Sequence, residues 1–196
     1  MPGASALRTS AYSALAEELV AQQERAETLD VASVGTASIA SSGNVRAMAF
    51  SVDSSLLISG GLDERVTVCE AATGRAVRQH KYQAEVRAIA VSPDNTVLAY
   101  GGADRRVVLR DLKMGTLLKE IDYTCAVRCI EFAPDGSHFA TGGENGRVML
   151  RDTLTGSPLD EFAFSATLGK EGAVESVAFS KDGSHMCTGP ARRDHD

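Results

Sequence analysis

The chain has 196 residues, a formal net charge of −6 and a hydrophobic content of 43%, which suffices for a packed core and excludes wholesale disorder. The acidic balance argues against a general nucleic-acid binder, because such domains usually carry excess positive charge to neutralise phosphate. No stretch approaches the ~20 consecutive apolar residues of a membrane helix, and the N-terminus lacks a signal-peptide pattern; we therefore expect a cytoplasmic protein without an integral membrane segment, a nuclear location being left open.

The N-terminal part predicts a helix followed by a linker. Residues 10–30 contain neither Gly nor Pro and are rich in Ala, Leu, Glu and Gln, so we assign residues 1–30 to an N-terminal helical segment. The apolar stripe of this helix is short. The helix could pair with a helix of a partner, or it could pack on the surface of the following domain. Residues 31–43, rich in Ser, Gly, Thr and Ala, predict a linker or a clasp strand.

The rest of the chain is built on one repeated segment. Val86–Asp111 recurs upstream as Val45–Glu70 and downstream as Val127–Asp152, with a constant step of 41 residues. A fourth copy begins at Val174, 47 residues after the third, and is incomplete. Repeats of about 40–45 residues that contain short strands indicate propeller blades rather than a helical array.

Breaks inside each copy place four strands. In the second copy these are Val86–Val91, Thr96–Tyr100, Arg106–Asp111 and Leu117–Ile121, separated by turns rich in Pro, Asp, Asn and Gly. Four short strands with tight turns predict an antiparallel meander. We divide residues 44–189 into three blades (45–85, 86–126 and 127–173) and a partial fourth (174–189), followed by a polar tail at 190–196.

The first strand of each copy alternates large and small apolar residues. Ile89 and Val91 point one way and Ala88 and Ala90 the other, and the remaining copies follow the same pattern except that the third has Cys129 and Glu131 on its small face. Two apolar faces of unequal size are expected where every sheet packs between two neighbours.

These blocks resemble the WD-repeat β-propeller family, whose blade reads V-x-S-V-x-F-S-P-D-G, then L-A-S-G-S-x-D, then a strand ending in Trp-Asp. VRAIAVSPDN, VLAYGGAD and RVVLRD fit in this order, and the resemblance covers about residues 45–189. The chain has no Trp. Its Trp positions hold Cys69, Arg110 and Arg151, and Tyr82 and Tyr123 replace the histidine that precedes the first strand.

The resemblance implies an all-β fold of four-stranded antiparallel blades, with the short N-terminal α-helix added. Propellers close with about four to eight blades, so three and a half copies make an incomplete propeller. We expect a fragment or truncated form of a larger propeller protein. The alternative is a half-ring that self-associates through its unclosed blades or is completed by another protein.

Catalysis has little support, because no catalytic or phosphate-binding motif is present. The four cysteines lack the spacing of a zinc site, and we interpret them as reduced, buried small hydrophobes. We therefore expect neither enzyme activity nor a metal or cofactor.

Phased arginines are the best candidates for function. One set of arginines follows the first Val of each copy, and the other set stands at the beginning of the third strand. In a meander the first and third strands begin at the same edge of the sheet, so both sets and two tyrosines lie on one rim. The predicted partner-binding residues are Arg46, Arg65, Tyr82, Arg87, Arg106, Tyr123, Arg128 and Arg147. Arg and Tyr are enriched in binding hot spots.

This rim and the resemblance predict a non-catalytic scaffold that binds acidic or phosphorylated peptides of other proteins. In the competing interpretation, the arginines only form exposed ion pairs with acids of the same rim, namely Asp63, Glu64, Glu85, Asp104 and Glu144. Two alternative functions remain. The protein could bind phosphoinositides or other acidic ligands at a membrane surface or, with less support, it could be a propeller enzyme.

Overall fold

The computed structural model describes residues 44–163 and 172–190. The predicted N-terminal helix and the linker or clasp strand lie outside the described residues, as does the polar tail apart from its first residue. The described residues are arranged in strands and turns and hold no helix that could cross a membrane.

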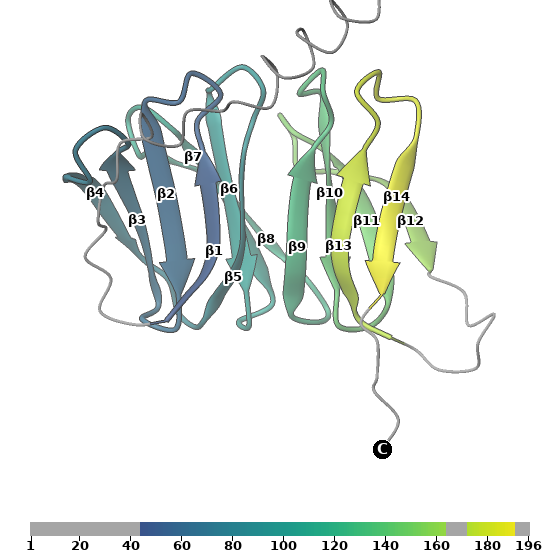
Figure 1. Ribbon diagram of the computed structural model, residues 1–196. Coiled ribbons are helices and arrows are strands. Elements are labelled where there is room, and N and C mark those ends of the chain that lie inside the picture. Colours follow the sequence, from purple (N-terminus) through teal and green to yellow (C-terminus); the bar gives the residue numbers. More distant parts are fainter. Residues whose placement is uncertain (1–43, 164–171, 191–196) are drawn as a thin grey trace, which may run out of the picture. The chain divides into compact units, whose positions relative to one another are not determined.

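The strands form three four-stranded sheets and one two-stranded sheet, and each sheet is an antiparallel meander in chain order (Figure 1). The first sheet contains β1 (Val45–Phe50), β2 (Leu56–Gly61), β3 (Arg65–Glu70) and β4 (Ala76–Lys81). The second contains β5 (Val86–Val91), β6 (Val97–Gly102), β7 (Arg106–Asp111) and β8 (Leu117–Asp122). The third contains β9 (Val127–Phe132), β10 (His138–Gly143), β11 (Arg147–Asp152) and β12 (Pro158–Ala163). The last contains β13 (Val174–Phe179) and β14 (Met186–Pro190).

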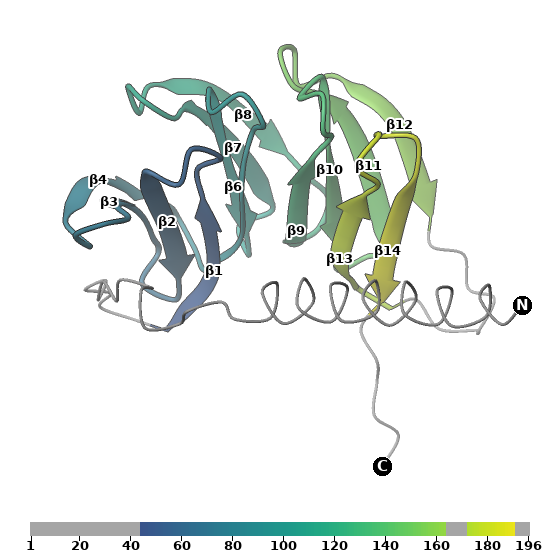
Figure 2. The same ribbon diagram turned by 45° about the horizontal axis from the view of Figure 1, so that its top comes forward.

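The first strands lie at the inner side of the stack, where β5 packs between β1 and β9, and β9 between β5 and β13 (Figure 2). The described sheets therefore make an incomplete propeller, as the repeats predict.

The glycine pair that ends the second strand belongs to the ladder, whereas the sequence predicted that this strand ends at Tyr100. Gly101 lies opposite Ala88 and Gly102 opposite Val86, so β6 runs to Gly102. A Cβ on Gly102 would lie 1.9 Å from the backbone oxygen of Glu85. Glycine is needed here because the backbone of the preceding loop approaches closely.

A serine and an aspartate fix the turn between the first and second strands. Ser92 Oγ donates to Asp94 Oδ1 (2.6 Å) and accepts from the backbone N–H of Val97 (2.8 Å). Ser51 and Asp53 repeat this bond in the first sheet, and Ser180 and Asp182 repeat it in the last. These side chains satisfy backbone groups that the turn leaves without a ladder partner.

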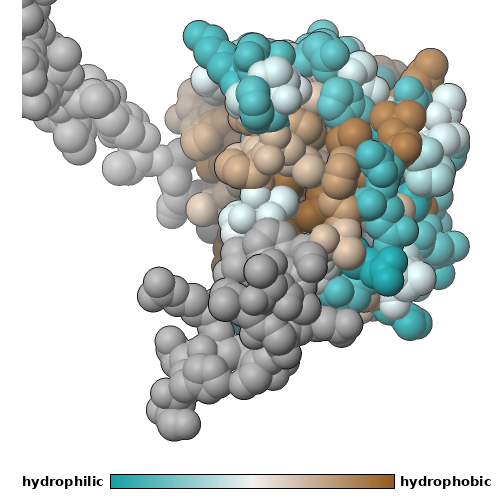
Figure 3. Space-filling view, turned by 90° about the vertical axis from the view of Figure 1, so that its right-hand side faces the viewer, coloured by the Kyte–Doolittle hydropathy of each residue, from teal (hydrophilic) through white to brown (hydrophobic). Residues whose placement is uncertain are grey.

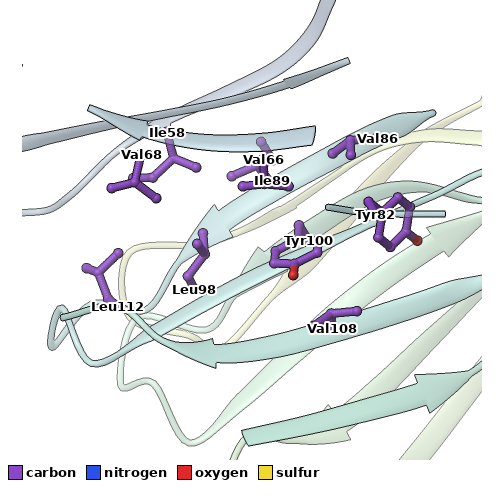
Figure 4. Close-up of a cluster of buried hydrophobic side chains, with 10 residues drawn as sticks. All are labelled: Ile58, Val66, Val68, Tyr82, Val86, Ile89, Leu98, Tyr100, Val108 and Leu112. Carbon is purple, nitrogen blue, oxygen red and sulfur yellow. The ribbon is translucent and has the colours of Figure 1, made fainter. Parts of the chain in front are cut away.

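Unequal faces interleave between neighbouring sheets. The first cluster joins Ile58, Val66 and Val68 of the first sheet to Ile89, Leu98 and Tyr100 of the second (Figure 4). Ala47 and Ala49 pack against this cluster, so the alanine face of one sheet receives the large side chains of the next. Equivalent clusters join the second sheet to the third and the third to the fourth.

The large-residue face of the first sheet has no such neighbour among the described residues. Met48 is 63% exposed and Phe50 60% exposed, although the equivalent Ile89 is only 9% exposed. At the other end of the stack, hydrophobic residues gather across the middle of the face and hydrophilic ones lie along its upper and right-hand edges (Figure 3).

We expect Gly102→Ala to destabilise the fold by about 3 kcal/mol, because the new methyl must displace backbone rather than a flexible side chain. Gly136→Asn is the matched control. Gly136 has φ +71°, and Asn95 adopts φ 58° at the equivalent turn position, so this change should cost within about 1 kcal/mol. Urea unfolding followed by circular dichroism measures both variants, and equal losses would contradict the backbone-contact explanation.

Candidate functional site

The arginines that follow the first Val of each copy are β-bulge residues. The register of each first strand shifts across Arg46, Arg87 and Arg128, so none of the three has a partner on the second strand. Glu175 holds the same place in the fourth sheet. A bulge turns a side chain away from the regular alternation, and here all four belong to the start of an inner strand.

These four bulge residues and two further glutamates form a chain of ion pairs across all four sheets, which we call the rim ladder. Glu85 lies 2.9 Å from Arg46 Nε and accepts from Arg87 Nε (2.8 Å). Glu144 accepts from Arg87 Nη1 (2.6 Å) and Arg128 Nη2 (2.9 Å). Arg128 Nη1 lies 3.2 Å from Glu175 and completes the ladder. The ladder thus connects each sheet to the next.

Charge along the rim ladder is balanced, with three arginines and three glutamates. Hydrogen bonding from Arg87 lowers the pKa of Glu85. Burial raises the pKa of Glu144, but hydrogen bonds from Arg87 and Arg128 outweigh it and leave that pKa lowered. The ladder surrounds a polar cleft of about 280 Å³ lined by Arg46, Glu85, Arg87, Arg128 and Glu175.

The arginines that begin the third strands lie at the same edge, as predicted, but they form contacts within their own sheets. Arg65 donates to Gln79 (2.6 Å) and Arg147 to Glu161 (2.5 Å). Arg106 lies 3.4 Å from Asp122 and 4.0 Å from Glu120. Each arginine therefore pairs with the outer strand, while the rim ladder follows the inner strands.

The two predicted rim tyrosines also make contacts inside the sheets. Tyr82 is only 7% exposed. Its hydroxyl contacts Asp104 and donates to the backbone oxygen of Arg106 (2.8 Å). The Tyr82 ring meets Tyr100 edge to face, with centroids 5.6 Å apart. Arg110, at the tryptophan position, donates from Nε to Tyr100 Oη (2.7 Å).

In the third sheet, the equivalent tyrosine and arginine positions form different hydrogen bonds. Arg151 Nε donates to Tyr123 Oη (2.9 Å), and the guanidinium carbon lies 4.8 Å from the ring centroid. Thr141 Oγ1 donates to the same hydroxyl (3.1 Å). Arg151 Nη1 donates to the Gly156 oxygen (2.9 Å), as Arg110 Nη1 does to the Gly115 oxygen. Arg110 and Arg151 thus bind their own blades.

All four cysteines are free, but they are not all buried as predicted. Cys69 is buried, Cys125 and Cys129 are partly buried, and Cys187 is exposed. Burial raises the pKa of the Cys129 thiol to about 11, so this thiol is protonated at neutral pH.

The family model described as "WD domain, G-beta repeat" matches residues 34–69, 74–111 and 115–152, more than half of the chain. The chain belongs to the WD-repeat family. WD-repeat proteins are generally non-catalytic scaffolds for protein interactions. No curated protein matches this WD-repeat chain.

The second and third family repeats each straddle two sheets of the fold. The match to 74–111 covers β4, which is the outer strand of the first sheet, and then β5, β6 and β7 of the second. The match to 115–152 combines β8 with β9, β10 and β11 in the same way. Each of these two repeats therefore supplies strands to two consecutive WD sheets.

Glu144→Gln should destabilise the chain by about 1 kcal/mol, because it removes the charge that two arginines of different sheets share. Glu161→Gln is the matched control, since Glu161 pairs with Arg147 inside one sheet; we expect about 0.5 kcal/mol or less. Urea unfolding at low salt measures the difference, and 1 M NaCl should shrink it by screening. A loss for Glu161→Gln that equals the loss for Glu144→Gln would argue against cross-sheet coupling.

Acid should weaken the fold through its turn aspartates. Hydrogen bonds from Ser51 and Ser55 lower the pKa of Asp53 from 3.8 to about 2, and those from Ser180 and Ser184 do the same for Asp182. A lowered folded-state pKa contributes stability above the unfolded pKa, and this contribution is lost as the pH falls through the folded value. We therefore expect the free energy of unfolding to fall between about pH 4 and pH 2.

The Asp53→Asn variant isolates this effect. It should be less stable than the unmodified chain at pH 7 and should match it near pH 2, where Asp53 itself becomes protonated. Urea unfolding across this pH range is the measurement, and a constant difference between the two proteins would contradict the assignment.

Proposed function

We propose that this WD-repeat chain is an interaction scaffold whose rim-ladder cleft binds a phosphorylated segment of another protein. The observation that carries the proposal is the convergence of Arg46, Arg87 and Arg128 on one cleft at the starts of three inner strands. The cleft is open to solvent, since the Arg46 side chain is 55% exposed and that of Arg128 33% exposed.

The resident glutamates favour a phosphoryl group over a simple carboxylate as the ligand. A carboxylate that entered the cleft would replace one ion pair by an equivalent one, and exposed pairs are worth only ~0–1 kcal/mol. A phosphoryl group carries about −1.5 to −2 charges and three acceptor oxygens, so it can engage two guanidiniums at once. Glu85 and Glu144 then discriminate against acidic peptides that lack phosphate.

Two arginine variants test the site. The probe is a degenerate phosphoserine and phosphothreonine peptide library, compared with the same library after phosphatase treatment. Arg87→Gln should weaken phosphopeptide capture about tenfold, since Arg87 joins the two glutamates at the centre of the ladder. Arg106→Gln is the control, because Arg106 pairs with the outer strand of its own sheet, and it should change capture less than twofold.

Glu144→Gln makes the test two-sided. This variant leaves Arg87 and Arg128 without their shared carboxylate, so phosphopeptide binding should tighten while stability declines. Weaker binding in this variant, or equal losses in Arg87→Gln and Arg106→Gln, would overturn the rim-ladder site. Binding of phosphoinositide vesicles without any phosphopeptide binding would instead favour a ligand at a membrane surface.

A further inference from the structure

The third sheet holds a pocket of about 140 Å³ that is separate from the rim-ladder cleft. Tyr123, Thr141, Met149 and Arg151 line it, together with the exposed residues Asp122, Thr124, Arg147 and Glu161. Gly142 and Gly143 form part of the wall, together with Cys125, Val127 and Asn145.

The second sheet shows why this space is empty in the third. A step of 41 residues maps Thr141 onto Tyr100, Met149 onto Val108 and Arg151 onto Arg110. In the second sheet the Tyr100 ring lies inside the cluster beside Tyr82 and is 1% exposed (Figure 4). The first tyrosine and the arginine persist in the third sheet as Tyr123 and Arg151, but the second ring is replaced by a threonine.

The pocket is lined by the tyrosine and the arginine that correspond to the two neighbours of Tyr100 in the second sheet. There, Tyr100 packs edge to face on Tyr82 at an interplanar angle of 77°, and its hydroxyl accepts from Arg110 Nε. In the third sheet, Arg151 Nε and Thr141 Oγ1 donate to Tyr123 Oη instead. The pocket is therefore bounded by an aromatic ring and hydroxyl groups, with Val127 and Met149 among its apolar lining.

We infer that this pocket receives the phenol ring of a tyrosine side chain presented by a partner protein. Its volume suits one six-membered ring, because a cavity of about 150 Å³ is known to take up benzene. The equivalent position in the second sheet holds a phenol whose hydroxyl is hydrogen-bonded, and a phenol hydroxyl can likewise bond to the polar groups of this lining, whereas a phenylalanine ring cannot. The exposed residues at its mouth leave room for the peptide that carries the ring.

The experiment titrates the full chain with N-acetyl-tyrosinamide, N-acetyl-phenylalaninamide and p-cresol while amide chemical shifts are recorded. Saturable shifts at Gly142 and Gly143 are expected with the tyrosine compound, together with at least threefold weaker binding of the phenylalanine compound. Absence of saturation at these glycines with N-acetyl-tyrosinamide would overturn the inference. Saturation by p-cresol alone would overturn the assignment to a tyrosine side chain.

Two reciprocal substitutions provide matched controls. Thr141→Tyr gives the third sheet its own ring, so ligand binding should be lost and the melting temperature should rise. Tyr100→Thr empties the equivalent space in the second sheet, so the melting temperature should fall and ligand shifts should appear at Gly101 and Gly102. If Thr141→Tyr retains binding at Gly142, or if Tyr100→Thr creates no second site, the pocket is not a vacant ring position.

Discussion

The fold depends on the packing of a large apolar face against a small one at every junction between sheets. Ile89 and Leu98 are buried because the alanine face of the first sheet lies against them. The outer strands contribute little to this core, since every residue of β12 is exposed. A single blade therefore has no core of its own, and the rim ladder adds a polar connection along the inner strands where the apolar contacts are made.

The family's tryptophan position is occupied by other residues, and these form different side-chain hydrogen bonds inside the blades. The second sheet joins Tyr82 to Asp104 and Tyr100 to Arg110, and the third joins Arg151 to Tyr123. In both sheets the guanidinium also bonds to the turn after its strand. An arginine side chain is long enough to reach a hydroxyl and a turn carbonyl together, which fixes the outer turn to the middle of the sheet.

Much of the fold could be predicted because the repeat fixes strand order, and turn residues fix strand ends. The starts and ends of β5 and β7 match the prediction, and the ion pairs of Glu85 and Glu144 were among the alternatives considered. The role of Glu175 was missed because its position holds arginine in the other copies, so periodicity gave no sign of it. The sequence pattern within one copy does not indicate which residues of different copies contact each other.

Burial was harder to predict than strand position, because it depends on what lies beside a residue. Cys187 occupies the place that Ile58 holds in the first sheet, yet Ile58 is fully buried and Cys187 is exposed. The difference comes from the neighbouring sheet that covers Ile58. Tyr82 illustrates the converse, since a residue placed at the rim by its sequence position is only 7% exposed.

The offset between family repeats and sheets determines how a chain of this kind tolerates changes in repeat number. Removal of the repeat at 74–111 would take β4 from one sheet and β5, β6 and β7 from the next. The remaining β8 would then follow β3 directly and could become the fourth strand of the first sheet. Gain or loss of a whole repeat thus leaves the strand complement of each remaining sheet intact.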